Sequence, residues 1–72
     1  MNNSYRKYQF KRENRTYLIE EDLLTVGWYL YEFDEAGSCI ADQLQNSLKI
    51  IFEVAKEKYG IPNEGWVLID DK

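Results

Sequence analysis

The fold depends most on Val26–Tyr59, VGWYLYEFDEAGSCIADQLQNSLKIIFEVAKEKY. Residues 26–33 are rich in aromatic side chains, which favour a β-strand. Asp34 and Gly37 then occupy the first and fourth positions of a type I turn that is followed by a left-handed residue. The stretch therefore predicts a β-hairpin over residues 26–41 that runs into a long helix.

This hairpin is predicted to be apolar on both faces. The turn places Phe33 opposite Cys39, Glu32 opposite Ile40 and Tyr31 opposite Ala41. One face then carries Tyr29, Tyr31, Phe33, Cys39 and Ala41, and the other carries Val26, Trp28, Leu30, Glu32 and Ile40. We expect Val26, Trp28, Leu30 and Ile40 to face the helix.

The helix is predicted over Gln43–Tyr59. Asp42 has the side chain of an N-cap, and Gln45 three residues later completes a capping-box pair. Gly60 ends the helix as a left-handed residue, and Pro62 prevents it from resuming. The core stripe is Leu44, Leu48, Ile51, Phe52, Ala55 and Tyr59, and Ile50 and Val54 form an apolar shoulder beside it.

The N-terminal part is predicted to form a second hairpin, with strands over 4–12 and 15–21 and a two-residue turn at Glu13-Asn14. In this register Phe10 lies opposite Tyr17 and Tyr8 opposite Ile19. Residues 65–70 are predicted to form a short buried strand. We therefore expect one α+β domain over residues 1–72, with a small antiparallel sheet of four to five strands, order β-β-β-β-α-β, and one long helix packed on one face.

The composition argues against catalysis and against metal or cofactor binding. The chain has no histidine, so it lacks the commonest general base and metal ligand. Cys39 is the only cysteine, and we interpret it as a buried strand residue rather than a nucleophile. Glu32 is the one carboxylate at a position where an apolar residue is expected, because it shares a strand face with Trp28 and Leu30. We predict no enzyme, no cofactor, no metal and no small-molecule ligand, and a carboxylate-based enzyme is the weakest of three function classes.

The charge is unevenly distributed along the chain. Residues 1–15 hold five basic residues and one acid, whereas residues 16–72 hold four lysines and twelve acids. The first strand alternates basic and aromatic side chains, as in grooves that bind single-stranded nucleic acid. Its candidate contacts are Arg6, Lys7, Tyr8, Lys11 and Arg12. The alternative is that this basic hairpin pairs with the acidic body of the same domain, which we favour.

Several segments resemble small bacterial proteins of uncharacterised function. They are Trp28–Tyr31, Cys39–Asp42, Leu44–Leu48 and Tyr59–Trp66, and the resemblance covers residues 26–68. It implies an α+β fold and a bacterial cytoplasmic origin, and it carries no activity and no site residue. No apolar run reaches the length of a membrane span, and a single thiol suits a reducing compartment, so we expect a cytoplasmic protein without membrane contact.

The number of apolar faces favours a binding function. One helix covers only one face of a small sheet, so the second apolar face of the hairpin is left for a partner unless the Leu23-Leu24 connector or the Trp66 segment covers it. The leading hypothesis is a non-enzymatic protein-interaction module, either a homo-oligomer or an accessory, inhibitor or immunity-like partner of another protein. Its candidate interface residues are Tyr29, Tyr31, Phe33, Ile50 and Val54. The alternative function is nucleic-acid binding through the first strand.

Overall fold

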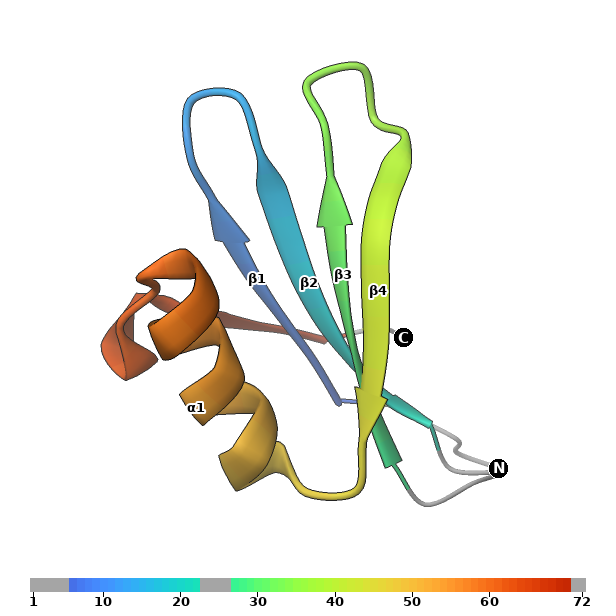
Figure 1. The fold of residues 1–72 in the computed structure, drawn as a ribbon, viewed down its shortest axis with the longest axis vertical. Helices are drawn as coiled ribbons and strands as arrows, with labels where there is room; N and C mark the ends of the chain where they lie inside the picture. Colours follow the sequence, from blue (N-terminus) through green and yellow to red (C-terminus); the bar gives the residue numbers. More distant parts are fainter. Residues whose placement is uncertain (1–5, 23–26, 71–72) are drawn as a thin grey trace.

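Five antiparallel strands form one sheet, and a single helix packs against it (Figure 1). The structure, a computed structural model, describes residues 6–22 and 27–70. The elements are β1 (Arg6–Lys11), β2 (Thr16–Asp22), β3 (Gly27–Phe33), β4 (Cys39–Gln45), α1 (Leu48–Tyr59), a 3-10 turn (Asn63–Gly65) and β5 (Val67–Asp70). The strand order is β4-β3-β2-β1-β5. The predicted α+β class and the order of elements along the chain are confirmed.

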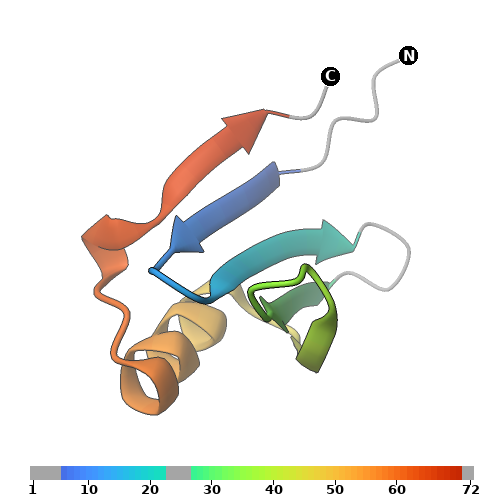
Figure 2. The same ribbon diagram turned by 90° about the horizontal axis from the view of Figure 1, so that it is seen from above.

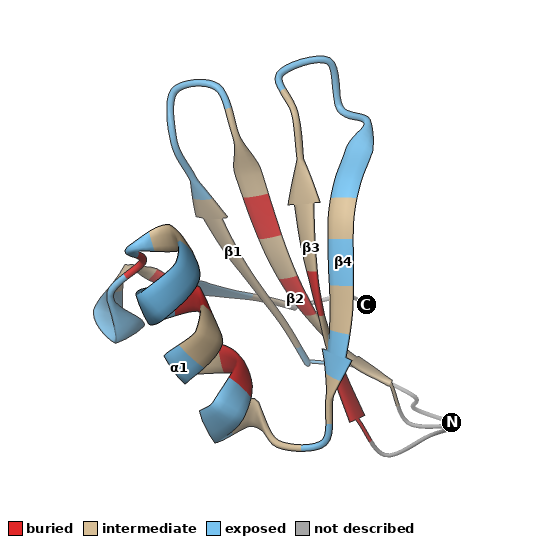
Figure 3. Ribbon diagram, viewed as in Figure 1, coloured by how far each residue is buried: buried red, intermediate tan, exposed pale blue. Residues whose placement is uncertain are grey.

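The core lies between α1 and one face of the sheet. Figure 2 shows α1 on one side of the strands, and Figure 3 shows the buried segments of β2, β3 and α1. The buried apolar residues are Tyr17, Ile19, Trp28, Leu30, Ile51, Ala55, Ile61 and Trp66. Trp28 and Leu30 therefore face the helix as predicted, whereas Val26 lies outside the described residues.

The β1–β2 hairpin has the predicted register. Phe10 lies opposite Tyr17, and Tyr8 lies opposite Ile19. The two-residue turn is closed by the Arg12 amide, which donates a hydrogen bond to the Arg15 carbonyl at 2.8 Å. Alternation along both strands sends these aromatic and aliphatic side chains to the helix side and the residues between them to the other side.

The β3–β4 hairpin departs from the predicted register after its turn. The Asp34 amide donates to the Ser38 carbonyl at 2.9 Å, and Phe33 pairs with Cys39, as expected. The register then shifts, because Ile40 is an extra residue in a β-bulge. The predicted pairs of Glu32 with Ile40 and of Tyr31 with Ala41 are therefore wrong.

The bulge also changes which side chains of β4 share a face with β3. Glu32 pairs with Ala41, and Tyr31 pairs with Asp42. Ile40 is 48% exposed, so the prediction that it faces the helix is wrong. Ala41 changes sides for the same reason, because a shift of one residue moves a side chain to the other face of a sheet.

The helix begins at Leu48 rather than at Gln43, so the prediction of Asp42 as its N-cap is wrong. Residues 39–45 continue as a strand because all of them except Ile40 pair with β3, from Phe33 to Trp28. The strand pairing satisfies the backbone hydrogen-bonding groups of these residues, although the same residues are also compatible with a helix. Pairing with β3 therefore outweighs the local capping signal. Leu44 is consequently a strand residue that is 46% exposed, not a helix core residue.

The C-terminal end of α1 is confirmed. Gly60 has a φ of 68°, and its amide donates to the Lys56 carbonyl at 3.0 Å. The Ile61 amide donates to the Ala55 carbonyl at 3.2 Å, and Ile61 is fully buried. These two bonds satisfy carbonyls that the helix leaves free and turn the chain toward β5.

The last strand lies at an edge of the sheet, beside β1. Val67 is 61% exposed and Leu68 is 57% exposed, so the prediction of a buried strand is wrong. Trp66, just before β5, is buried and packs against Phe10 and Phe52 with ring centroids 6.0 and 6.2 Å away. Trp66 therefore packs on the helix side and does not cover the second face of the sheet, whereas the Leu23-Leu24 connector lies outside the described residues.

Candidate functional site

The candidate site is the sheet face opposite α1, which we call the open face. Strand alternation and the pairing registers assign its members. They are Lys7, Gln9 and Lys11 on β1; Thr16, Leu18 and Glu20 on β2; Tyr29, Tyr31 and Phe33 on β3; Asp42 and Leu44 on β4; Val67 and Ile69 on β5. No helix of the described chain covers this face (Figure 2).

An aromatic row runs along β3 in the middle of the open face. The rings of Tyr29 and Tyr31 stack with centroids 5.5 Å apart and an angle of 18° between their planes. The rings of Tyr31 and Phe33 are 6.1 Å apart. Burial raises the pKa of Tyr31, and the negative charges of Glu20 and Asp42 also act in that direction. The row is therefore a largely apolar surface, in which the raised pKa favours the neutral form of the Tyr31 hydroxyl.

A hollow of about 270 Å³ adjoins one end of the aromatic row. It is lined by Glu20, Glu21, Asp22, Tyr29 and Tyr31. Within residues 6–22 and 27–70, no group of three or more acidic, cysteine or histidine side chains is arranged to hold a metal ion. Glu20 is paired with Lys7 across the strands at 3.7 Å. The hollow therefore joins the acidic end of β2 to the tyrosine rings of the aromatic row.

The five predicted interface residues do not share one surface. Tyr29, Tyr31 and Phe33 lie on the open face, whereas Ile50 and Val54 belong to α1 on the other side of the sheet. Ile50 is 38% exposed, and Val54 is partly buried against the core. The apolar shoulder of the helix is therefore separate from the aromatic row.

The five predicted nucleic-acid contacts are also divided between the two faces. Lys7 and Lys11 are on the open face, and Tyr8 packs in the core at 5.5 Å from the Phe52 ring. Arg6 forms an ion pair with Glu21 at 3.6 Å and lies 5.4 Å from the centre of the Trp28 ring. This division follows from strand alternation, which sends neighbouring residues to opposite sides.

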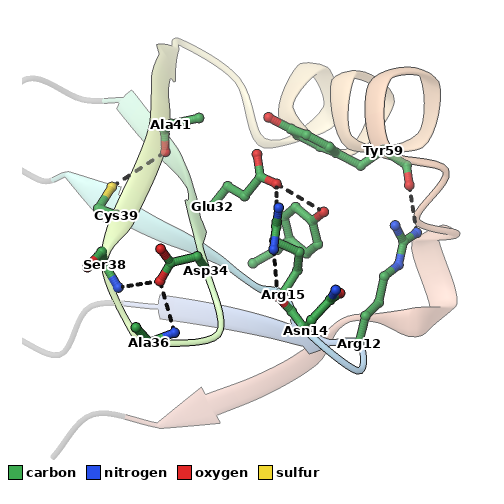
Figure 4. A network of polar contacts seen from close by, with 11 residues as sticks. Arg12, Asn14, Arg15, Glu32, Asp34, Ala36, Ser38, Cys39, Ala41 and Tyr59 are labelled. Carbon is green, nitrogen blue, oxygen red and sulfur yellow. Dashed lines mark hydrogen bonds and ion pairs between the residues drawn. The ribbon is translucent and has the colours of Figure 1, made fainter.

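Arg12 is engaged on the helix side as well. Its guanidinium lies over the rings of Phe10 and Tyr17, at 5.3 and 5.6 Å. Its Nη2 donates to the Tyr59 carbonyl at 2.6 Å, where a cation also suits the carboxyl end of α1 (Figure 4). Together with the ion pairs of Arg6 and Lys7, this contact favours the interpretation that the basic hairpin binds its own domain.

Glu32 belongs to a polar cluster that the sequence did not reveal. Its Oε2 accepts a hydrogen bond from Arg15 Nε at 3.2 Å and one from the Tyr17 hydroxyl at 3.4 Å (Figure 4). The side chain is only 15% exposed. Burial raises the pKa of Tyr17 and of Tyr59, and the charge of Glu32 raises both further. The cluster lies at the end of the helix side near the hairpin turns, and the Glu32 carboxylate has Arg15 as its counter-ion.

The Glu32→Gln variant is expected to lower the pKa of Tyr17 and of Tyr59. Both pKa values are raised above 10.0 in the folded protein, so the stabilisation linked to them is present below about pH 10 and is lost as the pH rises through the folded values. Removing the negative charge should move this loss to lower pH. An NMR titration of the tyrosine ring signals measures the shift. Glu35→Gln, in the exposed turn, is the control, and an identical titration in both variants would contradict the role of Glu32.

Cys39 is exposed, so its prediction as a buried residue is wrong. Its Sγ contacts the Ala41 carbonyl oxygen at 3.5 Å (Figure 4). The position beside the bulge explains the exposure, because Cys39 begins an edge strand that has no neighbour beyond it.

No protein-family model, curated protein or solved structure matches this chain. The resemblance to small bacterial proteins therefore stays a prediction. In the part of the chain that the structure describes, no helix has the length and apolar character needed to cross a membrane.

Proposed function

We propose that this chain is a non-enzymatic protein-binding module that docks another protein, a second copy included, on its open face. One observation carries the proposal: α1 covers one side of the sheet, while the row of Tyr29, Tyr31 and Phe33 lies on the side that no described helix covers. Tyrosine and phenylalanine are enriched in the centres of protein interfaces, and contiguous exposed apolar surface marks binding sites.

The surroundings of the aromatic row also suit a protein partner. Glu20 and Asp42 lie on the same face and would repel a polyphosphate chain, whereas Lys7 is already paired with Glu20. A phosphate-binding surface needs cations that are collected on one side and unpaired. An accessory, inhibitor or immunity-like role in a reducing cytoplasm agrees with this small acidic domain and its exposed thiol.

Capture of partners from the native host at low and at high salt tests this function. After nuclease treatment, we expect a protein to be retained by the tagged chain under both conditions, because apolar contacts are little screened by salt. Nucleic-acid binding would instead weaken by orders of magnitude between the two conditions. In parallel samples without nuclease, retention of nucleic acid and of no protein, with loss at high salt, would contradict the proposal in favour of the alternative function.

A further inference from the structure

We infer that the open face binds the open face of a second copy of this chain, in a two-fold symmetric sandwich whose axis runs parallel to the strands between β2 and β3. The inference rests on the proposed function and names its partner. In this arrangement β3 of each copy lies over β2 of the other, and β4 lies over β1.

The charges on the open face are arranged for this pairing. Asp42 is exposed on β4, on one side of the aromatic row, and Lys11 is exposed on β1, on the other side. Neither side chain has an ion-pair partner among the described residues. Rotation about the proposed axis brings β4 over β1 of the partner and so places Asp42 of each copy over Gln9 of the partner subunit, between Lys7 of the partner subunit and Lys11 of the partner subunit along the strand. Opposite charges then meet twice, once on each side of the interface.

The apolar residues meet in the centre under the same rotation. One row across the sheet is Asp42, Tyr31, Leu18 and Gln9. Reversing this row places Tyr31 over Leu18 of the partner subunit, and the reciprocal contact forms on the other side of the axis. An isologous interface requires this self-complementarity, in which each residue and its contact exchange roles.

The area of the face suits a dimer of modest affinity. In this arrangement four strands of each copy overlap, since β5 lies beyond β4 of the partner. Four strands spaced by about 4.8 Å span about 19 Å, and seven residues of β3 at about 3.3 Å each span about 23 Å. The overlapping sheet plane is therefore on the order of 450 Å² in each copy, and side-chain relief raises it toward the roughly 600 Å² per partner at the lower limit of specific interfaces. A short chain with a single small core also gains most from burying a second apolar face.

Charge reversal at the two ends of the interface tests the arrangement. We expect sedimentation of the wild type to show a monomer–dimer equilibrium, and Asp42→Lys or Lys11→Glu alone to weaken it about tenfold or more, because each variant places like charges together twice. An equimolar mixture of the two variants should dimerise like the wild type. In that heterodimer the introduced lysine meets the introduced glutamate, and the unchanged Asp42 meets the unchanged Lys11. This restoration also shows that both variants are folded.

Matched variants on the exposed side of α1 serve as controls. Glu53→Lys and Lys56→Glu make the same changes in net charge away from the open face and should leave the equilibrium unchanged. A wild type that stays monomeric at high concentration, or a dimer that is indifferent to Asp42→Lys and Lys11→Glu, would overturn the inference. If a monomeric chain retains a different host protein and loses it on Tyr31→Glu, the self-pairing is wrong while the proposed function stands. If it retains no protein, both are wrong.

Discussion

Ile19→Ala is expected to lower the free energy of unfolding by about 2–5 kcal/mol, the usual cost of truncating a buried aliphatic residue. Ile19 is 0% exposed and lies in β2 between Tyr8 and Leu30, with α1 packed over this side of the sheet. At about 0.05–0.15 kcal/mol per residue, the whole domain has about 4–11 kcal/mol of stability. The variant should therefore lose a large part of it, which denaturant unfolding of a dilute sample measures.

Leu18→Ala is the matched control for this core substitution. Leu18 is the neighbouring residue of the same strand, but its side chain is on the open face and is only partly buried. We expect a cost below about 1 kcal/mol in the dilute monomer, as for most substitutions outside the core. Equal costs for Ile19→Ala and Leu18→Ala would mean that both faces of the sheet are covered, and the open face would then not be free to bind a partner.

The β1–β2 hairpin and the turn of the β3–β4 hairpin could be predicted because their signals are local. Alternation in β1 and β2, together with the two-residue turn at Glu13-Asn14, gives the register that collects Tyr8, Phe10, Tyr17 and Ile19 on one side. The Asp34–Gly37 turn and the stop of α1 at Gly60 each depend on backbone conformations that few residues adopt.

The bounds of β4 and α1 could not be predicted from the same local signals. Asp42 and Gln45 form a capping pattern, yet six residues of their segment pair with β3. The Ile40 bulge has no signature in the sequence, and it changes the face of every side chain that follows it in β4. The position of β5 beside β1 is likewise a consequence of tertiary packing, since nothing in residues 67–70 indicates which strand they pair with.

The placement of the candidate interface residues in the fold could be predicted in part. The spacing of Tyr29, Tyr31 and Phe33 by two residues predicts a shared strand face, and the structure places them together. The sequence also groups Ile50 and Val54 with these residues, because both sets are apolar. A sequence pattern does not show, however, on which side of the sheet the helix and its apolar shoulder lie. The cluster around Glu32 joins residues 15, 17, 32 and 59, so it exists only after folding.

Tyr31→Glu is expected to weaken partner binding by a factor of about 100 or more while the domain stays folded. Tyr31 is the central ring of the aromatic row, and tyrosines at interface centres contribute about 2 kcal/mol or more when they are removed. The new carboxylate would also lose its hydration beside Asp42 and Glu20 in the complex. Because the side chain lies outside the core, unfolding of the variant should resemble that of the wild type.

Ile50→Glu is the control for placing a carboxylate on an apolar surface. Ile50 is on α1, on the other side of the sheet, and is 38% exposed. We expect this variant to bind its partner like the wild type, because it leaves the open face unchanged. Comparison of the two variants shows whether the partner binds at the aromatic row or at the apolar shoulder of the helix.

The most direct test of a binding function for the open face is the affinity of wild type, Tyr31→Glu and Ile50→Glu for the captured partner, measured on folded samples whose circular dichroism spectra agree. We expect that only Tyr31→Glu loses binding. Unchanged binding by Tyr31→Glu, or loss by Ile50→Glu instead, would contradict the assignment of function to the open face.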